Sequence, residues 1–424
     1  MLTERLLQFI WQFQYFNKQA LLTTNEEGLS IIHPGTYNTN QGPDFLDAKI
    51  KRGNTIWAGN IEIHINASHW LLHQHQNDDN YNNVILHVVW SEDKKLNDRN
   101  GTPIPTFVIE PHVSKLMLEH YQRLMNEQGF VPCEHYLPVL SPLGWQSWQE
   151  RLLIERLQKR AGLVFQRLKE TGNHWEEVFW YQLARNFGAP VNSDAFESMA
   201  QSIPVSVLAK HKNQIHQLEA LLLGQSNLLG EESNDDYVLL LQREYSFLKS
   251  KYKLKESPNM PVFLRMRPLN FPTVRLAQLA MLIHQSEHLF SKIVEAKESK
   301  DVVRLLNVTA NDFWHYHYQM NAASPYKPKA LGETMAGIIM MNTVVPVVFA
   351  YGLYHNIQAY KDKAMEWLMQ LKGEQNGVIK SWKLFDVNAG NALQTQALLE
   401  LKKHYCDKRK CLDCAVGNKI LKQA

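Results

Sequence analysis

Residues 42–65 of this chain read GPDFLDAKIKRGNTIWAGNIEIHI, and this stretch decides the predicted fold. Apolar and polar residues alternate on both sides of a turn at Arg52-Gly53-Asn54, which predicts two antiparallel strands. Asp44 stands at the start of the first strand, and Glu62 lies in the second. Burying a carboxylate is costly unless a metal ion or a hydrogen-bond donor compensates, so this hairpin is the best candidate for a functional site.

Strand and helix patterns extend outward from the hairpin. Apolar residues at helical spacing over residues 3–20 predict an amphipathic helix, with Glu4 and Gln8 outside its apolar face. Ser68 is placed to cap a short helix that contains Trp70. Strands are predicted over residues 45–50, 55–66, 83–90 and 105–110, and helices over residues 144–171, 175–187, 193–203, 205–222, 237–252, 272–283 and 334–354. The sequence therefore predicts an α+β fold in two domains: residues 1–112 with a small mixed sheet, and an all-helical region over residues 113–424.

Composition narrows the class of protein. A net charge of +3 over 424 residues is nearly neutral, so a nucleic-acid-binding surface would have to be a local basic patch. The longest apolar region, residues 335–353, contains Asn342, Thr343 and Pro346, which indicates a buried helix and not a membrane span. The N-terminus lacks the pattern of a secretory signal. We therefore expect a cytoplasmic protein without a membrane segment.

The carboxylates of the hairpin predict a metal site. Adjacent antiparallel strands can bring Asp44 and Glu62 together, where their oxygens would bind a hard divalent cation. His64 follows Glu62 by two residues, and the two-residue period of a strand places both side chains on one face. The alternative is structural: Asp44 caps a turn, and Glu62 pairs with Lys49 or Lys51 across the hairpin.

Pro43-Asp44 followed by Glu62-Ile63-His64 on the next strand resembles the core of the PD-(D/E)XK nucleases, with His64 where those enzymes usually have lysine. The resemblance covers roughly residues 1–112. It implies that Asp44 and Glu62 hold Mg²⁺ or Mn²⁺ and that His64 acts as base or third ligand in the hydrolysis of a phosphodiester. A neutral imidazole can serve as a base near pH 7, but it lacks the fixed positive charge of lysine.

The whole chain also resembles an uncharacterised bacterial family, a domain of unknown function familiar from the Bacteroidetes. The segments that carry this resemblance include GPDF at residues 42–45, WAGNIEIH at residues 57–64, RMRP at residues 265–268 and CLDC at residues 411–414. This resemblance implies no activity.

Other polar residues are candidates for substrate binding. His73 shares a face with His75 if the chain is extended there, or with His69 if it is helical. Arg265 and Arg267 alternate on one face of an extended segment, where both guanidinium groups would reach a phosphate. Solvated loop histidines and surface ion pairs are the structural alternatives.

Three cysteines form a C-x4-C-x2-C cluster near the C-terminus: Cys406, Cys411 and Cys414. With Cys133, they would supply four thiolates to Zn²⁺ or to a [4Fe-4S] cluster. The arrangement of one upstream and three downstream cysteines is similar to that of some PD-(D/E)XK nucleases whose iron-sulfur cluster joins the two ends of the domain. The alternative is four buried, reduced core cysteines.

From the sequence, we expect a metal-dependent nuclease-like domain attached to a helical domain that positions nucleic acid, either DNA or RNA. The rival hypothesis is a non-catalytic nucleic-acid-binding or scaffold protein in which the cysteine site is purely structural.

Overall fold

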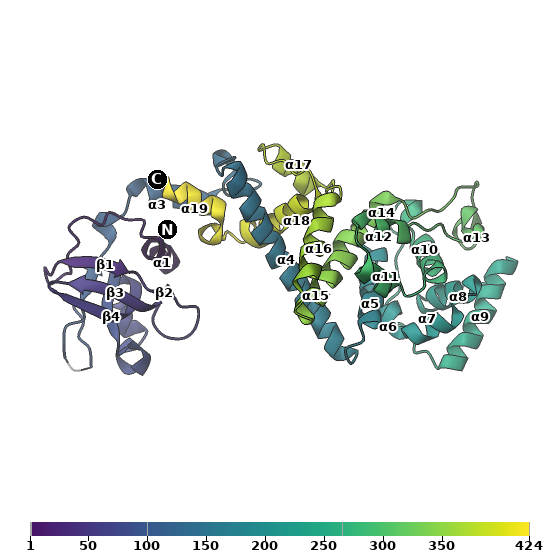
Figure 1. Ribbon diagram of the computed structural model, residues 1–424, viewed down its shortest axis with the longest axis horizontal. Helices are drawn as coiled ribbons and strands as arrows, with labels where there is room; N and C mark the ends of the chain where they lie inside the picture. Colours follow the sequence, from purple (N-terminus) through teal and green to yellow (C-terminus); the bar gives the residue numbers. More distant parts are fainter. Residues whose placement is uncertain (1, 100, 265, 424) are drawn as a thin grey trace. The chain divides into compact units, whose positions relative to one another are not determined.

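The computed structural model describes residues 2–99, 101–264 and 266–423. The chain forms two compact units. The first comprises Met1–Trp145, Leu384–Val387 and Leu401–Ala424, and the second comprises Gln146–Lys383 and Asn388–Glu400. The predicted sheet-bearing segment, residues 1–112, is part of the first unit, and the helix-rich remainder confirms the predicted α+β class (Figure 1).

The first unit contains a mixed sheet. Its strands are β1 (Leu29–His33), β2 (Thr36–Tyr37), β3 (Phe45–Arg52), β4 (Thr55–Asn66), β5 (Val84–Ser91) and β6 (Thr106–Val108). The order across the sheet is β1-β3-β4-β5-β6, and β2 pairs with the start of β3. The β3–β4 hairpin is antiparallel as predicted, whereas β4–β5 and β5–β6 are parallel. The parallel β4–β5 pair requires a crossover between these strands, and this crossover carries His69, His73 and His75.

One face of the sheet is apolar and is covered by helix α1 (Glu4–Phe13) (Figure 1). Residues that pair across neighbouring strands point to the same face of a sheet. Ile63 pairs with Val88 and Val88 with Phe107, so these three residues lie on the apolar face. The Trp11 ring lies 6.5 Å from the Phe107 ring. The helix predicted over residues 3–20 is shorter than expected because Gln14 adopts a left-handed conformation and ends it.

The crossover covers the other face with α2 (His69–Leu72) and the 3-10 turns η1 (His75–Asn77) and η2 (Asp79–Tyr81). Trp70 packs there in a small apolar cluster with Ala67, Val89, Leu96 and Ile104. Ser68 occupies the predicted N-cap position of α2, but its side chain makes no capping hydrogen bond: its hydroxyl and its backbone N–H donate to the carboxylate of Asp93 at 2.6 and 2.8 Å.

The remaining helical elements of the first unit are η3 (Glu110–His112), α3 (Lys115–Asn126), η4 (Glu134–Tyr136), the π-helical turn η7 (Lys402–Cys406), η8 (Cys411–Asp413) and α19 (Ala415–Lys422). Helix α4 (Pro142–Glu170) begins in the first unit and continues in the second. Helix α19 packs on α3, so the C-terminal segment belongs to the same unit as the sheet.

The second unit is built on helices. They are α5 (Trp175–Phe187), α6 (Ser193–Ser202), α7 (Val205–His211), α8 (Ile215–Gln225), α9 (Asp236–Tyr252), η5 (Pro268–Asn270), α10 (Pro272–Gln285), α11 (Leu289–Glu295), α12 (Ser299–Leu305), α13 (Asp312–His315), α14 (Glu333–Ile339), the π-helical turn η6 (Met340–Val344), α15 (Val345–Tyr354), α16 (Gln358–Gln370), α17 (Gly377–Lys383) and α18 (Ala392–Leu401). Two details differ from the prediction. The helix expected over residues 205–222 is interrupted between α7 and α8, and a two-stranded sheet, β7 (His317–Gln319) with β8 (Ala322–Ala323), lies in the region expected to be all-helical.

The most apolar region forms one continuous helical rod from Glu333 to Tyr354, through α14, η6 and α15. It is long and apolar enough to cross a membrane by length and composition, but 72% of its apolar window is buried inside the protein. Pro346 lies near the start of α15, just after the π-helical turn. The predicted buried helix is therefore what the structure contains.

Candidate functional site

The hairpin brings Asp44 and Glu62 into direct contact. The Asp44 backbone N–H donates to Glu62 Oε2 at 3.0 Å, and the Ile63 N–H donates to Asp44 Oδ2 at 3.1 Å. Glu62 is buried, with 5% of its surface exposed, whereas Lys49 and Lys51 are exposed. The alternative in which Glu62 pairs with these lysines is therefore wrong for this hairpin.

The two carboxyl groups are poorly solvated. Burial, and then the charge of Glu62, raise the pKa of Asp44 to about 7. Burial raises the pKa of Glu62 to about 8. Donation from Gln8 Nε2 to Asp44 Oδ1, at 2.8 Å, opposes the shift of the Asp44 pKa only in part. Such a pair retains protons at neutral pH unless a cation offsets the charge.

His64 lies beside Glu62 on the same face of β4 and has 1% of its surface exposed. Its Nδ1 is 2.8 Å from His87 Nε2, on the neighbouring strand β5. Its Nε2 is 3.2 Å from His73 Nδ1 and 3.5 Å from Glu62 Oε1. Burial, and then the neighbouring histidines, lower the pKa of His64 to about 2. The imidazole is therefore neutral and has one N–H for two ring nitrogens that both face polar atoms.

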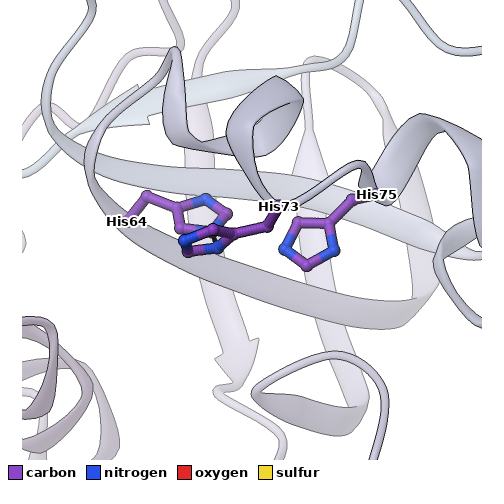
Figure 2. A group of neighbouring side chains, drawn as sticks. All are labelled: His64, His73 and His75. Atoms are coloured by element: carbon purple, nitrogen blue, oxygen red, sulfur yellow. Dashed lines mark hydrogen bonds between the residues drawn. The ribbon is translucent and has the colours of Figure 1, made fainter.

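His75 approaches Glu62 from the crossover. Its Nε2 lies 3.4 Å from Glu62 Oε1, and its ring stacks on Tyr81 with the centroids 3.9 Å apart. This Nε2 is buried and has no hydrogen-bond partner among the described residues. Figure 2 shows the rings of His64, His73 and His75 grouped together, with centroids 5.0 to 5.4 Å apart. One nitrogen from each ring forms a set within 4.8 Å of one another.

Of the residues predicted for the site, the structure brings together Asp44, Glu62, His64 and His73. Arg265 lies outside the described residues. Arg267 belongs to the second unit, where it is exposed and immediately precedes η5.

The sequence patterns predict no role in the site for several residues that surround it. Glu4, from α1, pairs with His69 at 3.1 Å and raises the pKa values of Asp44 and Glu62. Gln8 lies one helical turn after Glu4 and reaches Asp44. Glu4 and Gln8 lie outside the apolar face of the predicted helix. Their spacing of one helical turn is the sequence feature that indicates a shared polar face.

A pocket of about 450 Å³ opens beside His75 and Tyr81. Its lining also includes Arg52, Trp57 and Arg99. The Arg52 guanidinium lies over the Trp57 ring, 4.6 Å from its centroid, so one wall combines an aromatic surface with a cation.

The four cysteines are buried in the first unit, in two segments of the chain. Cys133 immediately precedes η4, Cys406 ends η7, Cys411 begins η8 and Cys414 immediately precedes α19. Arg409 joins the two segments by donating to the backbone carbonyls of Leu124, at 2.9 Å, and Glu127.

The cysteine thiols interact electrostatically. Burial, and then Cys414 and Cys411, raise the pKa of Cys133. Burial, and then Cys414, raise the pKa of Cys411 to about 12. Burial, and then the other three cysteines, also raise the pKa of Cys406. Cys133 therefore lies near enough to the C-terminal cysteines to affect their ionisation, and all four are free thiols.

A model of the protein family described as "Protein of unknown function (DUF2851)" matches residues 4–377. The matched residues include the histidine-carboxylate site and Cys133, and they end before Cys406. No curated protein matches the chain, and no solved structure matches it.

Proposed function

The chain belongs to the DUF2851 family of proteins of unknown function, and we propose that it is a metal-dependent phosphodiester hydrolase that acts on nucleic acid. The observation that carries the proposal is the partly buried contact between Asp44 and Glu62, with the buried His64 beside Glu62. Two adjacent carboxyl groups with little access to solvent are costly to ionise without a cation, which favours a metal-binding role over a purely structural one.

In this proposal, the oxygens of Asp44 and Glu62 hold Mg²⁺ or Mn²⁺. The metal supplies Lewis-acid polarisation of the phosphate and a lowered pKa for a bound water. Both ring nitrogens of His64 already face protein atoms, His87 on one side and His73 with Glu62 on the other. Because His64 is only 1% exposed, its imidazole is better placed to bind an ion inside the cluster than to take a proton from a water that arrives from solution, so the role of third ligand fits His64 better than that of base.

The order of elements supports the proposed likeness to the PD-(D/E)XK core. Helix α1 precedes an antiparallel set, β1-β3-β4, and the crossover with α2 leads to the parallel strand β5. Asp44 and Glu62 lie on the β3–β4 hairpin of this arrangement, with His64 in place of the usual lysine.

The pocket beside His75 supports nucleic acid as the substrate class. Trp57 offers an exposed ring on which a base could stack, and the Arg52 guanidinium lies next to it. His73 is the proposed substrate-binding residue of the first unit, and Arg265 and Arg267 stay sequence-based predictions for phosphate binding in the second unit. We also propose a cytoplasmic location for the protein, in keeping with a nucleic-acid substrate.

The rival function is that of a non-catalytic nucleic-acid-binding or scaffold protein with a structural metal site. The observation in its favour is that His64 stands where the nucleases usually have lysine and that both of its ring nitrogens face protein atoms. In this function Cys133, Cys406, Cys411 and Cys414 would hold Zn²⁺ or a [4Fe-4S] cluster. Both functions include this cysteine site, and they differ in whether the hairpin cleaves its ligand.

A cleavage assay tests the proposal. Purified full-length protein is incubated with DNA and RNA substrates and either Mg²⁺ or Mn²⁺, and compared with the variants Asp44→Ala and Glu62→Ala. We expect metal-dependent cleavage that each substitution reduces by at least ~10²-fold. Cleavage that survives both substitutions would exclude this site. Binding without cleavage by the unmodified protein would favour the rival.

A further inference from the structure

Three imidazole nitrogens, one each from His64, His73 and His75, lie within 4.8 Å of one another, and the Glu62 carboxylate borders two of these histidines. The distances from Glu62 Oε1 to His64 Nε2 and His75 Nε2 are 3.5 and 3.4 Å, and His64 Nε2 is 3.2 Å from His73 Nδ1. Four ligands about 2.1 Å from a tetrahedral ion lie roughly 3.4 Å from one another. These three separations, out of the six edges of such a tetrahedron, are close to this length, and a bound ion would draw Glu62 toward the set formed by the three imidazoles.

The positions of the protons on the histidine nitrogens leave lone pairs that favour a cation at the centre of the cluster. The Nδ1–H of His64 can donate to His87 Nε2, which leaves the Nε2 lone pair of His64 facing His73 Nδ1 and Glu62 Oε1. Histidine ligands usually hold this tautomer by donating their second N–H to a neighbouring acceptor, which is the position that His87 occupies. The buried His75 Nε2, which lacks a hydrogen-bond partner in the described part of the chain, faces the same centre.

The candidate ligands also differ in exposure in the way that a metal site requires. The side chains of His64, Glu62 and His75 are 1%, 6% and 10% exposed, so three of the candidate ligands form a dry base. His73 is exposed, which provides a route for the ion and a position that a ligand from solution can reach.

We propose that Glu62, His64, His73 and His75 bind one tetrahedral ion of the zinc class, with His87 as the second-sphere acceptor of His64. Three imidazoles and one carboxylate suit Zn²⁺ or Co²⁺, whereas Mg²⁺ prefers six oxygens in an octahedron. This inference rests on the proposed function in sharing Glu62 and His64, and it changes the metal that the site selects.

The test measures metal binding by the full-length chain, separately from cleavage. Metal-free protein is titrated with Zn²⁺ by calorimetry and with Co²⁺ by visible absorption, and compared with His73→Ala and His75→Ala. His73 is exposed and His75 belongs to the crossover and not to a strand of the sheet, so the fold should survive both substitutions, which circular dichroism verifies. His33→Ala removes an exposed imidazole of the same unit and serves as the matched control.

We expect the unmodified chain to bind one more equivalent of Zn²⁺ or Co²⁺ than the double variant His73→Ala/His75→Ala, because the cysteine site contributes equally to both. Each single variant should weaken this equivalent by roughly 10- to 100-fold or more, and the His33→Ala control should not. Equal stoichiometry and affinity in the unmodified and double-variant chains would overturn the inference.

A parallel cleavage assay separates this inference from the proposed function. Loss of the additional equivalent in the double variant, in a protein that cleaves nothing, would support the inference and refute the hydrolase. Mg²⁺-dependent cleavage by a chain that lacks the additional equivalent would refute the inference and support the hydrolase.

Discussion

The backbone N–H of Asp44 donates to the Oε2 atom of Glu62 at 3.0 Å, so a candidate metal ligand also fastens the start of β3 to β4. The second oxygen, Oε1, faces His64 and His75 at 3.5 and 3.4 Å. One carboxylate therefore divides its two oxygens between the fold and the histidine cluster. Substitutions at this position can separate the two roles.

Glu62→Gln should keep the fold and weaken metal binding. An amide oxygen can still accept the Asp44 N–H, so we expect the midpoint of urea unfolding of the metal-free protein to be no lower than that of the unmodified chain. The lost negative charge should lower Zn²⁺ affinity by at least ~10-fold, as measured by calorimetry. Glu62→Ala should impair both properties, since it leaves the Asp44 N–H without its acceptor, at a cost of about 1–3 kcal/mol. Equal metal affinity in Glu62→Gln and the unmodified chain would contradict this division of roles.

The cysteines should act as one site. Cys133→Ser and Cys411→Ser come from the two different segments, and we expect each to remove the same metal or cluster, because four thiolates complete the coordination. Protein purified without oxygen is analysed for zinc and iron and by visible absorption. Ser198→Ala in the second unit is a control remote in sequence from both segments. Retention of full metal content by Cys133→Ser would show that the C-terminal three bind without it.

A buried carboxyl group in the second unit predicts a pH dependence of stability. Glu219 is fully buried, accepts a hydrogen bond from the Tyr237 hydroxyl at 2.7 Å, and has a pKa raised by burial from 4.5 to about 7. Since the folded pKa is above the unfolded value, the contribution of Glu219 to stability is fully present below pH 4.5 and is lost as the pH rises to about 7. Glu219→Gln removes this loss and should stabilise the protein at pH 8 by up to ~3 kcal/mol.

Urea unfolding of the Glu219→Gln variant at pH 5 and pH 8 tests this prediction, with Glu232→Gln as a control at an exposed position. The difference between Glu219→Gln and the unmodified chain should grow from pH 5 to pH 8. A difference that is the same at both pH values would mean that Glu219 does not titrate in this range.

The start of the parallel β4–β5 pair depends on a glycine. A Cβ atom at Gly59 would lie 2.6 Å from the Asn83 carbonyl oxygen and 2.5 Å from Ile85 Cγ2. Gly59→Ala should therefore force these strands apart and destabilise the protein by about 1–3 kcal/mol in urea unfolding. Gly28→Ala is the matched control, because a Cβ at Gly28 meets nothing within 4 Å. Equal stability of the two variants would contradict a close approach at Gly59.

The parts of the fold that could be predicted are those with local periodicity. Strand β4 and helix α5 have the predicted bounds, 55–66 and 175–187, because alternation and helical spacing are properties of contiguous residues. The parallel pairing of β4 with β5 could not be read in this way, since it depends on the crossover between them. For the same reason, the contact of Asp44 with Glu62 followed from a hairpin, whereas the approach of Glu4 and Gln8 from α1 did not.

The positions of His73 and His75 show most clearly what the sequence pattern could not predict. Neither a fully extended nor a fully helical chain accounts for the placement of His73 and His75. His73 is the C-cap residue immediately after α2, Gln74 adopts a left-handed conformation with φ of 60°, and His75 begins η1. This single reversal at Gln74 turns both imidazoles toward His64, as Figure 2 shows. Glutamine carries no strong signal for such a conformation, so the sequence alone could not reveal it.

The backbone at Gln74 should therefore control the metal site without touching the ion. Gln74→Gly suits the left-handed conformation, so we expect unchanged Zn²⁺ affinity and equal or slightly higher stability. Gln74→Val places a β-branched residue where such side chains are rarely tolerated, which should cost about 1–2 kcal/mol in urea unfolding. It should also weaken Zn²⁺ binding by roughly 10-fold or more in calorimetry, since His73 and His75 lose their shared orientation. Because Gln74 is exposed, a packing defect does not explain such a loss. Zn²⁺ affinity that is equal in the valine and glycine variants would show that the histidines are positioned by something other than this turn.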